Sequence, residues 1–296
     1  MDIVAVAPRL PRPGETLTGS SYLNESGGKG ANQAYAVAKL GGTVAMLGRV
    51  GDDDHGRRMR ANLATVNCDV SGVRTVDGSS GVAVIYVAES GENSIVVVPG
   101  ANHRLTPKDL ETDSHYFENA GFVLLQLESP LETVIAAAHI GKRHSARVIL
   151  DPAPAPISLP RELLEAVDIL TPNETEARQL AQVRGVSDSL TVEEARAIAA
   201  RLQTQGVGTI VVKLGRQGCL LAEPHASTWV DAPRVNAVDT TAAGDVFNGA
   251  LAVASAEGAT LTDACRFAVR AASLSATRVG AQRSVPDRSE LGNALP

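Results

Sequence analysis

From residue 43 onward, short apolar segments alternate along the chain with longer segments of helical periodicity. This alternation is typical of parallel strands joined by crossover helices, because each helix returns the chain to the same end of the sheet. The sequence therefore predicts an α/β fold with three layers, in which a mostly parallel sheet lies between two layers of helices. The predicted strands are residues 44–47, 122–127, 148–150, 169–170 and 210–212, and the predicted helices are residues 31–40, 191–201, 243–256 and 261–277.

The composition limits the class of protein. A chain of 296 residues with 44% hydrophobic side chains can bury a sizeable core, and no long linker interrupts it, so we expect a single domain over residues 1–296. The net charge of −6 disfavours binding to nucleic acid. No apolar segment approaches the roughly 20 residues of a membrane span, no secretory signal is present, and three scattered cysteines suggest neither disulfides nor zinc. We expect a cytoplasmic protein without nucleic-acid or membrane partners.

Two segments, residues 1–22 and 81–98, depart from the strand–helix alternation. The second is typical of a hairpin, with two apolar arms around a turn at residues 90–93. A hairpin with one face in water should alternate apolar and polar residues, whereas both arms here are apolar on both faces. The pattern predicts a small β-sheet that serves as a lid over a ligand and packs on a partner subunit. Ordinary core strands are the alternative.

The strongest local signal is the sequence DTTAAGD at residues 239–245, immediately before a long predicted helix. The small residues Ala242, Ala243 and Gly244 let a ligand approach the backbone, and free amides at a helix start favour anions. Asp245 would accept a proton from an attacking hydroxyl while these amides stabilise a transferring phosphoryl group. Alternatively, Asp245 only complements the helix dipole.

A glycine-rich sequence, GGKGANQ at residues 27–33, precedes another predicted helix. It is not a Walker A loop, because Lys29 is followed by Gly30 rather than by Ser or Thr. Lys29 and Asn32 would bring an ammonium and an amide onto a polyol such as a sugar. A plain turn before a helix is the alternative.

Two further segments follow predicted strands. Asn173 can cap a helix that carries Glu176 in its first turn, and the same two side chains suit a magnesium ion bound through water. The sequence KLGRQG, from Lys213 to Gly218, would form a tight loop under a nucleotide, although a GxxG pattern alone has little specificity.

Together and in this order, these motifs resemble the ribokinase family of carbohydrate kinases. The resemblance extends from Asp2 to Pro286, and GGKGANQ with DTTAAGD carries most of its specificity. Supporting motifs are PRPGET at residues 11–16, QLESP at 126–130, DPAP at 151–154, TPNE at 171–174 and GAQRSVP at 280–286.

The resemblance implies ATP-dependent phosphorylation of D-ribose at O5, with Asp245 as the base and the amides of Ala242, Ala243 and Gly244 as an anion hole. It implies a homodimer formed through the β lid. The implied sugar ligands are Asp2, Gly28, Lys29, Asn32, Glu128 and Asp245. The implied nucleotide ligands are Asn173, Lys213, Leu214, Gly215, Arg216, Gln217, Gly218 and Gly244. Asn173 and Glu176 are implied for magnesium, and Asp239, Thr241, Ser275, Arg278, Gly280 and Ser284 for potassium.

Members of the family carry a core strand, ending in Asn, upstream of the position of Asp2. The chain begins at Met1, so we expect this form to be less stable or less active than one that includes the strand. Two other functions stay open. One is a kinase of the same fold for deoxyribose, a fructose-type sugar or an adenosine-like nucleoside, and the other is a non-catalytic protein that binds a sugar or a nucleotide.

Overall fold

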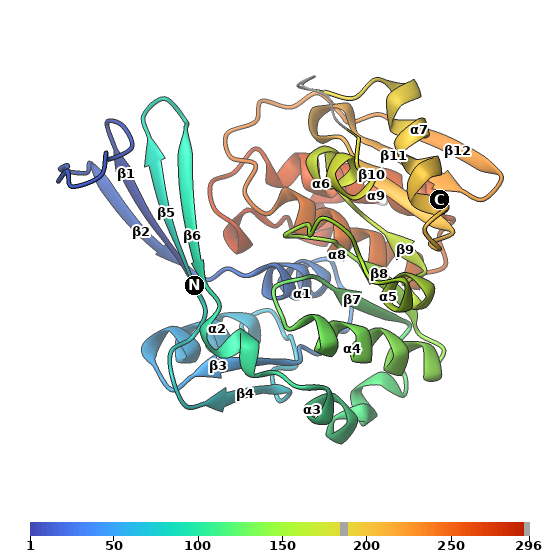
Figure 1. The fold of residues 1–296 in the computed structure, drawn as a ribbon, viewed down its shortest axis with the longest axis horizontal. Helices are drawn as coiled ribbons and strands as arrows, with labels where there is room; N and C mark the ends of the chain where they lie inside the picture. Colours follow the sequence, from blue (N-terminus) through green and yellow to red (C-terminus); the bar gives the residue numbers. More distant parts are fainter. Residues whose placement is uncertain (184–188, 293–296) are drawn as a thin grey trace.

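The computed structural model describes residues 1–183 and 189–292. It has a body, built around a six-stranded sheet between helices, and a four-stranded sheet that projects from one side of this body (Figure 1). The amino terminus lies where the projecting sheet meets the body. This arrangement confirms the predicted three-layer α/β fold with an additional small sheet.

The six-stranded sheet has the order β12-β11-β10-β9-β8-β7. Four neighbouring strands are parallel, and the two at one edge are antiparallel. Three of the parallel strands are mostly buried, as their runs of β-branched and leucine side chains predict, whereas the fourth, at the other edge, is half-buried. The parallel strands are β7 (Phe122–Leu125), β8 (Arg147–Leu150), β9 (Ile169–Leu170) and β10 (Thr209–Lys213), and the antiparallel ones are β11 (Cys219–Glu223) and β12 (Ala226–Val230).

Successive residues of these strands point to opposite faces of the sheet, and helices cover both faces. Ile149 and Val211 pack with one group of helices, whereas Val148 and Val212 pack with the other. The first group is α1 (Lys29–Lys39), α8 (Ala243–Ala256) and α9 (Leu261–Ser275), and the second is α4 (Leu131–Arg143), α5 (Arg161–Ala166), α6 (Glu174–Leu180) and α7 (Val192–Gln203).

The predicted strand at residues 44–47 is wrong in its position. The nearest strand, β3 (Gly48–Gly51), begins directly after the predicted range ends and pairs in parallel with β4 (Val73–Val76). Val44 and Met46 instead pack beside Leu63 and the first helix, which explains why this segment is apolar without being a strand. Helices α2 (Asp54–Ala64) and α3 (Pro107–Thr112) complete this part of the body.

The projecting sheet, here called the lid sheet, has the order β2-β1-β5-β6. Its register places Ile85 beside Ile95 on one face and Val84 beside Val96 on the other, so both faces are apolar. Every residue of the last strand is exposed. The strands are β1 (Asp2–Ala7), β2 (Ser21–Glu25), β5 (Val82–Ala88) and β6 (Asn93–Val98).

The two body sheets do not join. Strand β7 ends the six-stranded sheet, and β3 and β4 form a sheet of their own. An apolar slot separates β7 from residues 43–50 and belongs to a cavity of about 1190 Å³ that also borders α1, α8 and α4. Within the described residues, no strand occupies this slot. The buried Met1 lines the same cavity, and its ammonium donates to the Gly81 carbonyl over 2.9 Å.

None of the helices in the two described ranges combines the length and the hydropathy that crossing a bilayer requires.

Candidate active site

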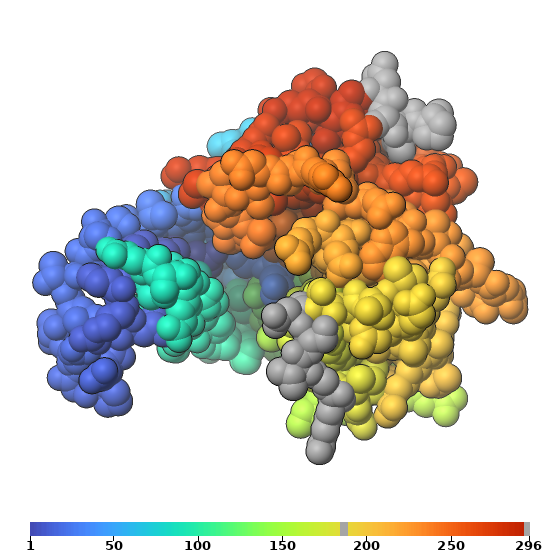
Figure 2. Space-filling model, turned by 90° about the horizontal axis from the view of Figure 1, so that it is seen from above, coloured from blue at the N-terminus to red at the C-terminus, as the bar shows by residue number. Residues whose placement is uncertain are grey.

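The polar end of the large cavity lies where the lid sheet meets the body. Figure 2 shows this region as a hollow between the blue and teal lid sheet and the orange and yellow part of the body. Four separate segments converge there: the first lid strand, the glycine-rich turn before α1, the loop after β7 and the start of α8. Of the predicted site residues, Asp2, Gly28, Lys29, Asn32, Glu128, Thr241, Ala242 and Asp245 line this cavity.

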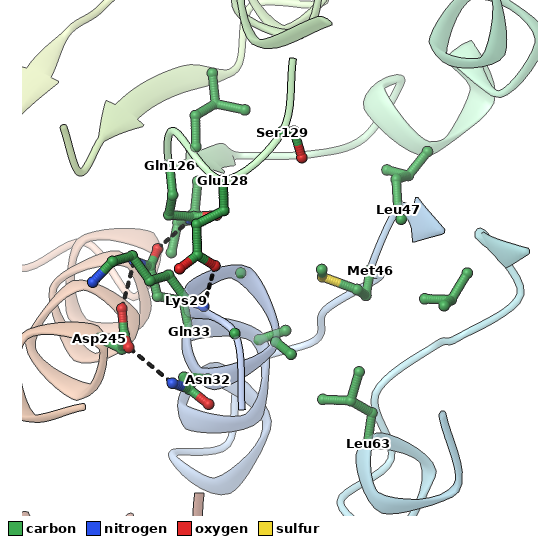
Figure 3. Close-up of a pocket in the computed structure, with 18 of the residues that line it drawn as sticks. Lys29, Asn32, Gln33, Met46, Leu47, Leu63, Gln126, Glu128, Ser129 and Asp245 are labelled. Atoms are coloured by element: carbon green, nitrogen blue, oxygen red, sulfur yellow. Dashed lines mark hydrogen bonds between the residues drawn. The ribbon is translucent and has the colours of Figure 1, made fainter. Parts of the chain in front are cut away.

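Asp245 stands in the first turn of α8, and its side chain is buried with a residual exposure of 5%. Each of its two carboxylate oxygens accepts a hydrogen bond from a side-chain amide. Asn32 Nδ2 donates to Oδ2 over 3.0 Å, and Gln33 Nε2 donates to Oδ1 over 3.1 Å (Figure 3). Because both amides come from α1, the contact between α1 and α8 fixes the orientation of the carboxylate.

Burial raises the pKa of Asp245 to about 6, since the ionised form loses solvation in this site. The nearby Lys29 ammonium opposes this rise, and the carboxylate of Asp151 adds to it. A carboxylate with such a pKa is ionised at neutral pH, yet it binds a proton more readily than an exposed aspartate. These are the properties of a general base.

The backbone before Asp245 supplies donors for an anion. Ala242 adopts a left-handed conformation, with φ of 59°. The amide of Ala243 donates to the Thr240 carbonyl over 3.2 Å, whereas the structure gives the amides of Ala242 and Gly244 no backbone acceptor among the described residues. The predicted anion hole therefore has two open amides and one that is already engaged.

Lys213 lies beside this backbone. Its Nζ is 3.4 Å from the point that a β carbon on Gly244 would occupy, and it forms an ion pair of 2.9 Å with Asp151 Oδ1. The sequence placed Lys213 only with the nucleotide. The structure puts the Lys213 ammonium next to the open amides. Its positive charge adds to their N–H donors and favours the binding of an anion there.

Three charged side chains, those of Asp2, Lys29 and Glu128, lie around the glycine-rich turn and line the cavity. The Lys29 amide donates to Glu128 Oε2 over 2.9 Å, and Gly28 takes a φ of 93° that favours glycine. Burial raises the pKa of both Glu128 and Asp2. Burial alone would lower the pKa of Lys29, but the carboxylates of Asp245, Asp151 and Glu128 raise it, so its ammonium stays charged.

Several polar residues of the site were missed from the sequence. Gln33 and Asp151 are almost completely buried, and Gln126 Nε2 donates to Gln33 Oε1 over 2.6 Å. Gln282 Nε2 donates to Asn32 Oδ1 over 3.0 Å. Each of these residues lies within a motif that carries the family resemblance, and this membership could have marked it as a site residue. Their contacts with one another depend on tertiary structure.

Asn173 and Glu176 form a capping box at the start of α6. Asn173 Oδ1 accepts from the Glu176 amide over 2.9 Å, and Glu176 Oε2 accepts from the Asn173 amide over 2.8 Å. Burial raises the pKa of Glu176. An isolated bridge joins Asn173 to Lys213, so both predicted nucleotide segments lie at the same end of the sheet. Neither segment lines the large cavity.

The predicted potassium residues come from two loops that meet. Asp239 Oδ1 accepts from the Thr241 amide over 2.9 Å, and Asp239 Oδ2 accepts from the Gly280 amide over 2.8 Å. The hydroxyls of Ser275 and Ser284 are buried and donate to local carbonyls, and Arg278 pairs with Glu290. The described residues contain no cluster of three or more acidic, histidine or cysteine side chains suited to a metal.

The comparisons with known proteins agree with this geometry. A family model described as pfkB family carbohydrate kinase matches residues 1–288. A ribokinase from Haemophilus influenzae is 41% identical over 290 residues, which cover 98% of this chain and 93% of the relative. A deoxyribokinase from Salmonella typhi is 37% identical over 296 residues, which cover 100% of this chain and 95% of the relative.

Solved structures show the same relationship. The structure of Arabidopsis thaliana ribokinase complexed with ribose and ATP has a TM-score of 0.92 and 37% identity, over 99% of this chain and 95% of that chain. The resemblance inferred from the motifs at residues 27–33 and 239–245 is thereby confirmed. With a family match over nearly its whole length and a buried carboxylate beside open backbone amides, the chain belongs to the pfkB family of carbohydrate kinases.

Proposed function

We propose that this chain transfers the γ-phosphoryl group of ATP to O5 of D-ribose, giving D-ribose 5-phosphate and ADP. The observation that carries the proposal is the buried carboxylate of Asp245, held by two amides beside the open amides of residues 242 and 244. The similarity to ribokinases of two organisms supports ribose as the sugar.

Asp245 accepts the proton of the attacking hydroxyl, so that the oxygen gains nucleophilicity as the phosphoryl group arrives. Negative charge develops on the transferring group at that moment. The amides of Ala242 and Gly244 and the ammonium of Lys213 lie where they stabilise this charge. Closure of the lid sheet over the cavity keeps water out, which prevents hydrolysis of ATP.

The sugar is held by hydroxyl-binding groups on three sides. Asp2 from the lid sheet and Glu128 from the loop after β7 accept hydrogen bonds, and Asn32 and Lys29 donate them. Gly28 lets the sugar approach the backbone. Because such groups are left unpaired by a ligand that lacks the matching hydroxyl, they discriminate between sugars more strongly than apolar contacts do.

The nucleotide end of the site lies at the carboxyl edge of the sheet. The loop of residues 213–218 would carry ATP, and Asn173 and Glu176 would face its phosphates. Asn173 Oδ1 and Glu176 Oε2 already accept the hydrogen bonds of the capping box. We therefore expect these two residues to hold a magnesium ion through water molecules, because Mg²⁺ keeps part of its hydration shell. When bound, Mg²⁺ neutralises phosphate charge.

Potassium is proposed for the two loops that Asp239 ties together. Each carboxylate oxygen of Asp239 already accepts one amide, from Thr241 or Gly280, so a cation there would bind mainly carbonyl oxygens. Such oxygens are the ligands that hard monovalent ions accept. The loop leads directly into the anion hole, and a bound K⁺ would stabilise its conformation. The remaining members of this set are Ser275, Arg278 and Ser284.

We also propose that residues 1–296 form one domain whose lid segments mediate a homodimer. The lid sheet exposes Tyr22, Tyr86 and Val96, with Val96 57% exposed, and an apolar surface of this kind is typical of an interface. A cytoplasmic location is proposed as well, because all three cysteines are free and buried.

The test is an ADP-release assay with a panel of sugars, in the presence and absence of K⁺. We expect the highest kcat/KM with ribose, a requirement for Mg²⁺ and an increase with K⁺. Ribose binding without turnover, in the wild-type chain, would contradict the proposed function. Mass spectrometry or NMR of the product identifies the phosphorylated oxygen.

Deoxyribose is the second candidate, because a deoxyribokinase is 37% identical to this chain over the whole length of this chain. The two sugars differ only at the 2-hydroxyl. A kcat/KM for deoxyribose above that for ribose would assign this alternative without changing the roles of Asp245 and Lys213.

A further inference from the structure

Gln33 joins two carboxylates of the site through a single side-chain NH₂ group. Its Nε2 lies 3.1 Å from Asp245 Oδ1 and 3.1 Å from Asp151 Oδ2. An amide NH₂ carries two hydrogens and can donate to both acceptors. All three side chains are buried, with exposures of 1% for Gln33, 5% for Asp245 and 2% for Asp151, so water is a poor substitute for this shared donor.

The carbonyl oxygen at the other end of this amide also has a partner. Gln126 Nε2 donates to Gln33 Oε1 over 2.6 Å (Figure 3). A rotation of the Gln33 amide by half a turn would place its carbonyl oxygen against two carboxylates and its NH₂ against that of Gln126. Because ionised carboxylates only accept hydrogen bonds and buried polar groups without partners are costly, Asp245 and Asp151 select the orientation in which Gln33 donates to them, and Gln126 satisfies the remaining carbonyl oxygen.

The network continues from Asp151 to the phosphoryl end of the site. Lys213 Nζ lies 2.9 Å from Asp151 Oδ1, the oxygen that Gln33 does not contact. The same ammonium approaches Gly244 at the open amides. Side chains from α1, β10 and the loop after β8 thus connect the proton acceptor with the cation at the anion hole.

We propose that Gln33 is a positioning residue of the kinase, which holds Asp245 and, through Asp151, Lys213 in one fixed relation. The proposal rests on the proposed function, in which Asp245 accepts the proton and Lys213 faces the phosphoryl group. Gln33 acts through these partners. A displacement of about 1 Å between reacting groups can lower a rate by roughly a hundredfold, which gives such a connection a purpose beyond packing.

The connection also affects the affinity of Asp245 for protons. From α1, the Lys29 ammonium lowers the pKa of Asp245, and from the loop after β8 the Asp151 carboxylate raises it. The hydrogen bonds from Asn32 and Gln33 lower it as well. Lys213 faces Asp151 on the side away from Gln33, at 2.9 Å from Oδ1. Loss of the Gln33 amide is expected to raise the pKa of Asp245, and neutralisation of Asp151 is expected to lower it.

The experiment compares Gln33→Leu, Asp151→Asn and the control Gln203→Leu with the wild type. Gln203 donates to the Gly208 carbonyl over 2.8 Å and does not line the cavity, so the control also removes one glutamine amide. Two quantities are measured between about pH 5 and 9. One is kcat with ribose, and the other is the titration of the Asp245 carboxyl carbon by ¹³C NMR, assigned by its loss in Asp245→Asn.

Gln33→Leu is expected to lower kcat by roughly tenfold or more, to leave the KM for ribose close to the wild-type value, and to shift the NMR midpoint to higher pH. Asp151→Asn is expected to shift the midpoint to lower pH. Gln203→Leu is expected to change neither.

A folded Gln33→Leu variant whose kcat and midpoint equal those of the wild type would overturn the proposal and leave Gln33 a packing residue. If Gln33→Leu does not fold, Gln33→Met, which also removes the shared donor, replaces it, and an unchanged kcat and midpoint in that variant would overturn the proposal. Absence of turnover in the wild type would contradict the proposed function alone, because the NMR midpoints still measure the coupling between Gln33, Asp151 and Asp245.

Discussion

The carboxylate of Asp2 fills the space beside Gly27 that any other residue at that position would need. A β carbon built on Gly27 would lie 2.0 Å from Asp2 Oδ2, well inside van der Waals contact. Asp2 belongs to the lid sheet and Gly27 to the turn before α1. The absence of a side chain at residue 27 is therefore what lets the lid sheet bring a carboxylate to the cavity.

We expect Gly27→Ala to raise the KM for ribose by roughly tenfold, the effect of losing one hydrogen bond from a charged group. The added methyl group displaces the Asp2 carboxylate, which can rotate away, so Tm should change little. Steady-state kinetics and thermal melting measure the two effects. Gly208→Ala is the control, because a β carbon there would make an ordinary contact of 3.8 Å. A KM equal to that of the wild type would show that Asp2 does not bind the sugar.

Activity should depend on the protonation of Asp245. Burial raises the pKa of Asp245 to about 6, and only the ionised form accepts a proton. We therefore expect kcat/KM, which reports the free enzyme, to be constant well above pH 6 and to fall as the pH decreases through about 6. A pH–rate profile measures this. An acid limb near the ordinary aspartate pKa, well below 6, would mean that the base is solvated in solution.

Asp245→Asn should remove the base while keeping the shape of the site. We expect kcat to fall by roughly 10² or more, whereas the affinity for ribose, measured by calorimetry, should decrease much less. The loss in kcat is compared with the loss in ribose affinity. Equal losses in binding and in turnover would indicate that the carboxylate holds the sugar and does not activate it.

The apolar slot between β7 and residues 43–50 leaves two strand edges without a neighbour in the described structure. Such edges gain hydrogen bonds and apolar contacts when a strand is added. We expect an engineered extension of Met1 by about eight alternating valine and isoleucine residues, long enough for one strand, to raise Tm and lower the KM for ribose. An extension of glycine and serine of equal length is the control. Equal Tm values for the two extensions would argue against a strand-binding slot.

The outer face of the lid sheet should control the oligomeric state. Val96 and Val84 lie side by side on that face, away from Ile95, which lines the cavity. We expect Val96→Asp to convert the proposed dimer into a monomer, measured by sedimentation. Ile157→Asp is the control, because Ile157 is 77% exposed outside the lid sheet. A dimer that survives Val96→Asp would place the interface elsewhere.

Local sequence accounts for much of the fold. Apolar runs at residues 148–150, 169–170 and 210–212 became buried strands, and the predicted helix at residues 243–256 has the bounds observed, because strand and helix periodicities depend on neighbouring residues. The segment at residues 44–47 shows the limit. Its apolar side chains satisfy the strand pattern, but they pack on helices, and apart from an isolated bridge between Ala45 and Asp69, continuous pairing begins at Gly48.

The sequence by itself determined the α/β class, the family and the candidate base, because Asp245 and its glycine-containing neighbours lie within one contiguous motif. Tertiary structure alone decided how that base is held. Asn32 and Gln33 are more than two hundred residues away along the chain, and Lys213 reaches the anion hole from another strand. Contacts between distant segments depend on how helices and strands pack, and local residue patterns do not encode this directly. For the same reason, only the structure showed that the amide of Ala243 is engaged while those of Ala242 and Gly244 are open, and that Gln33 donates to two carboxylates.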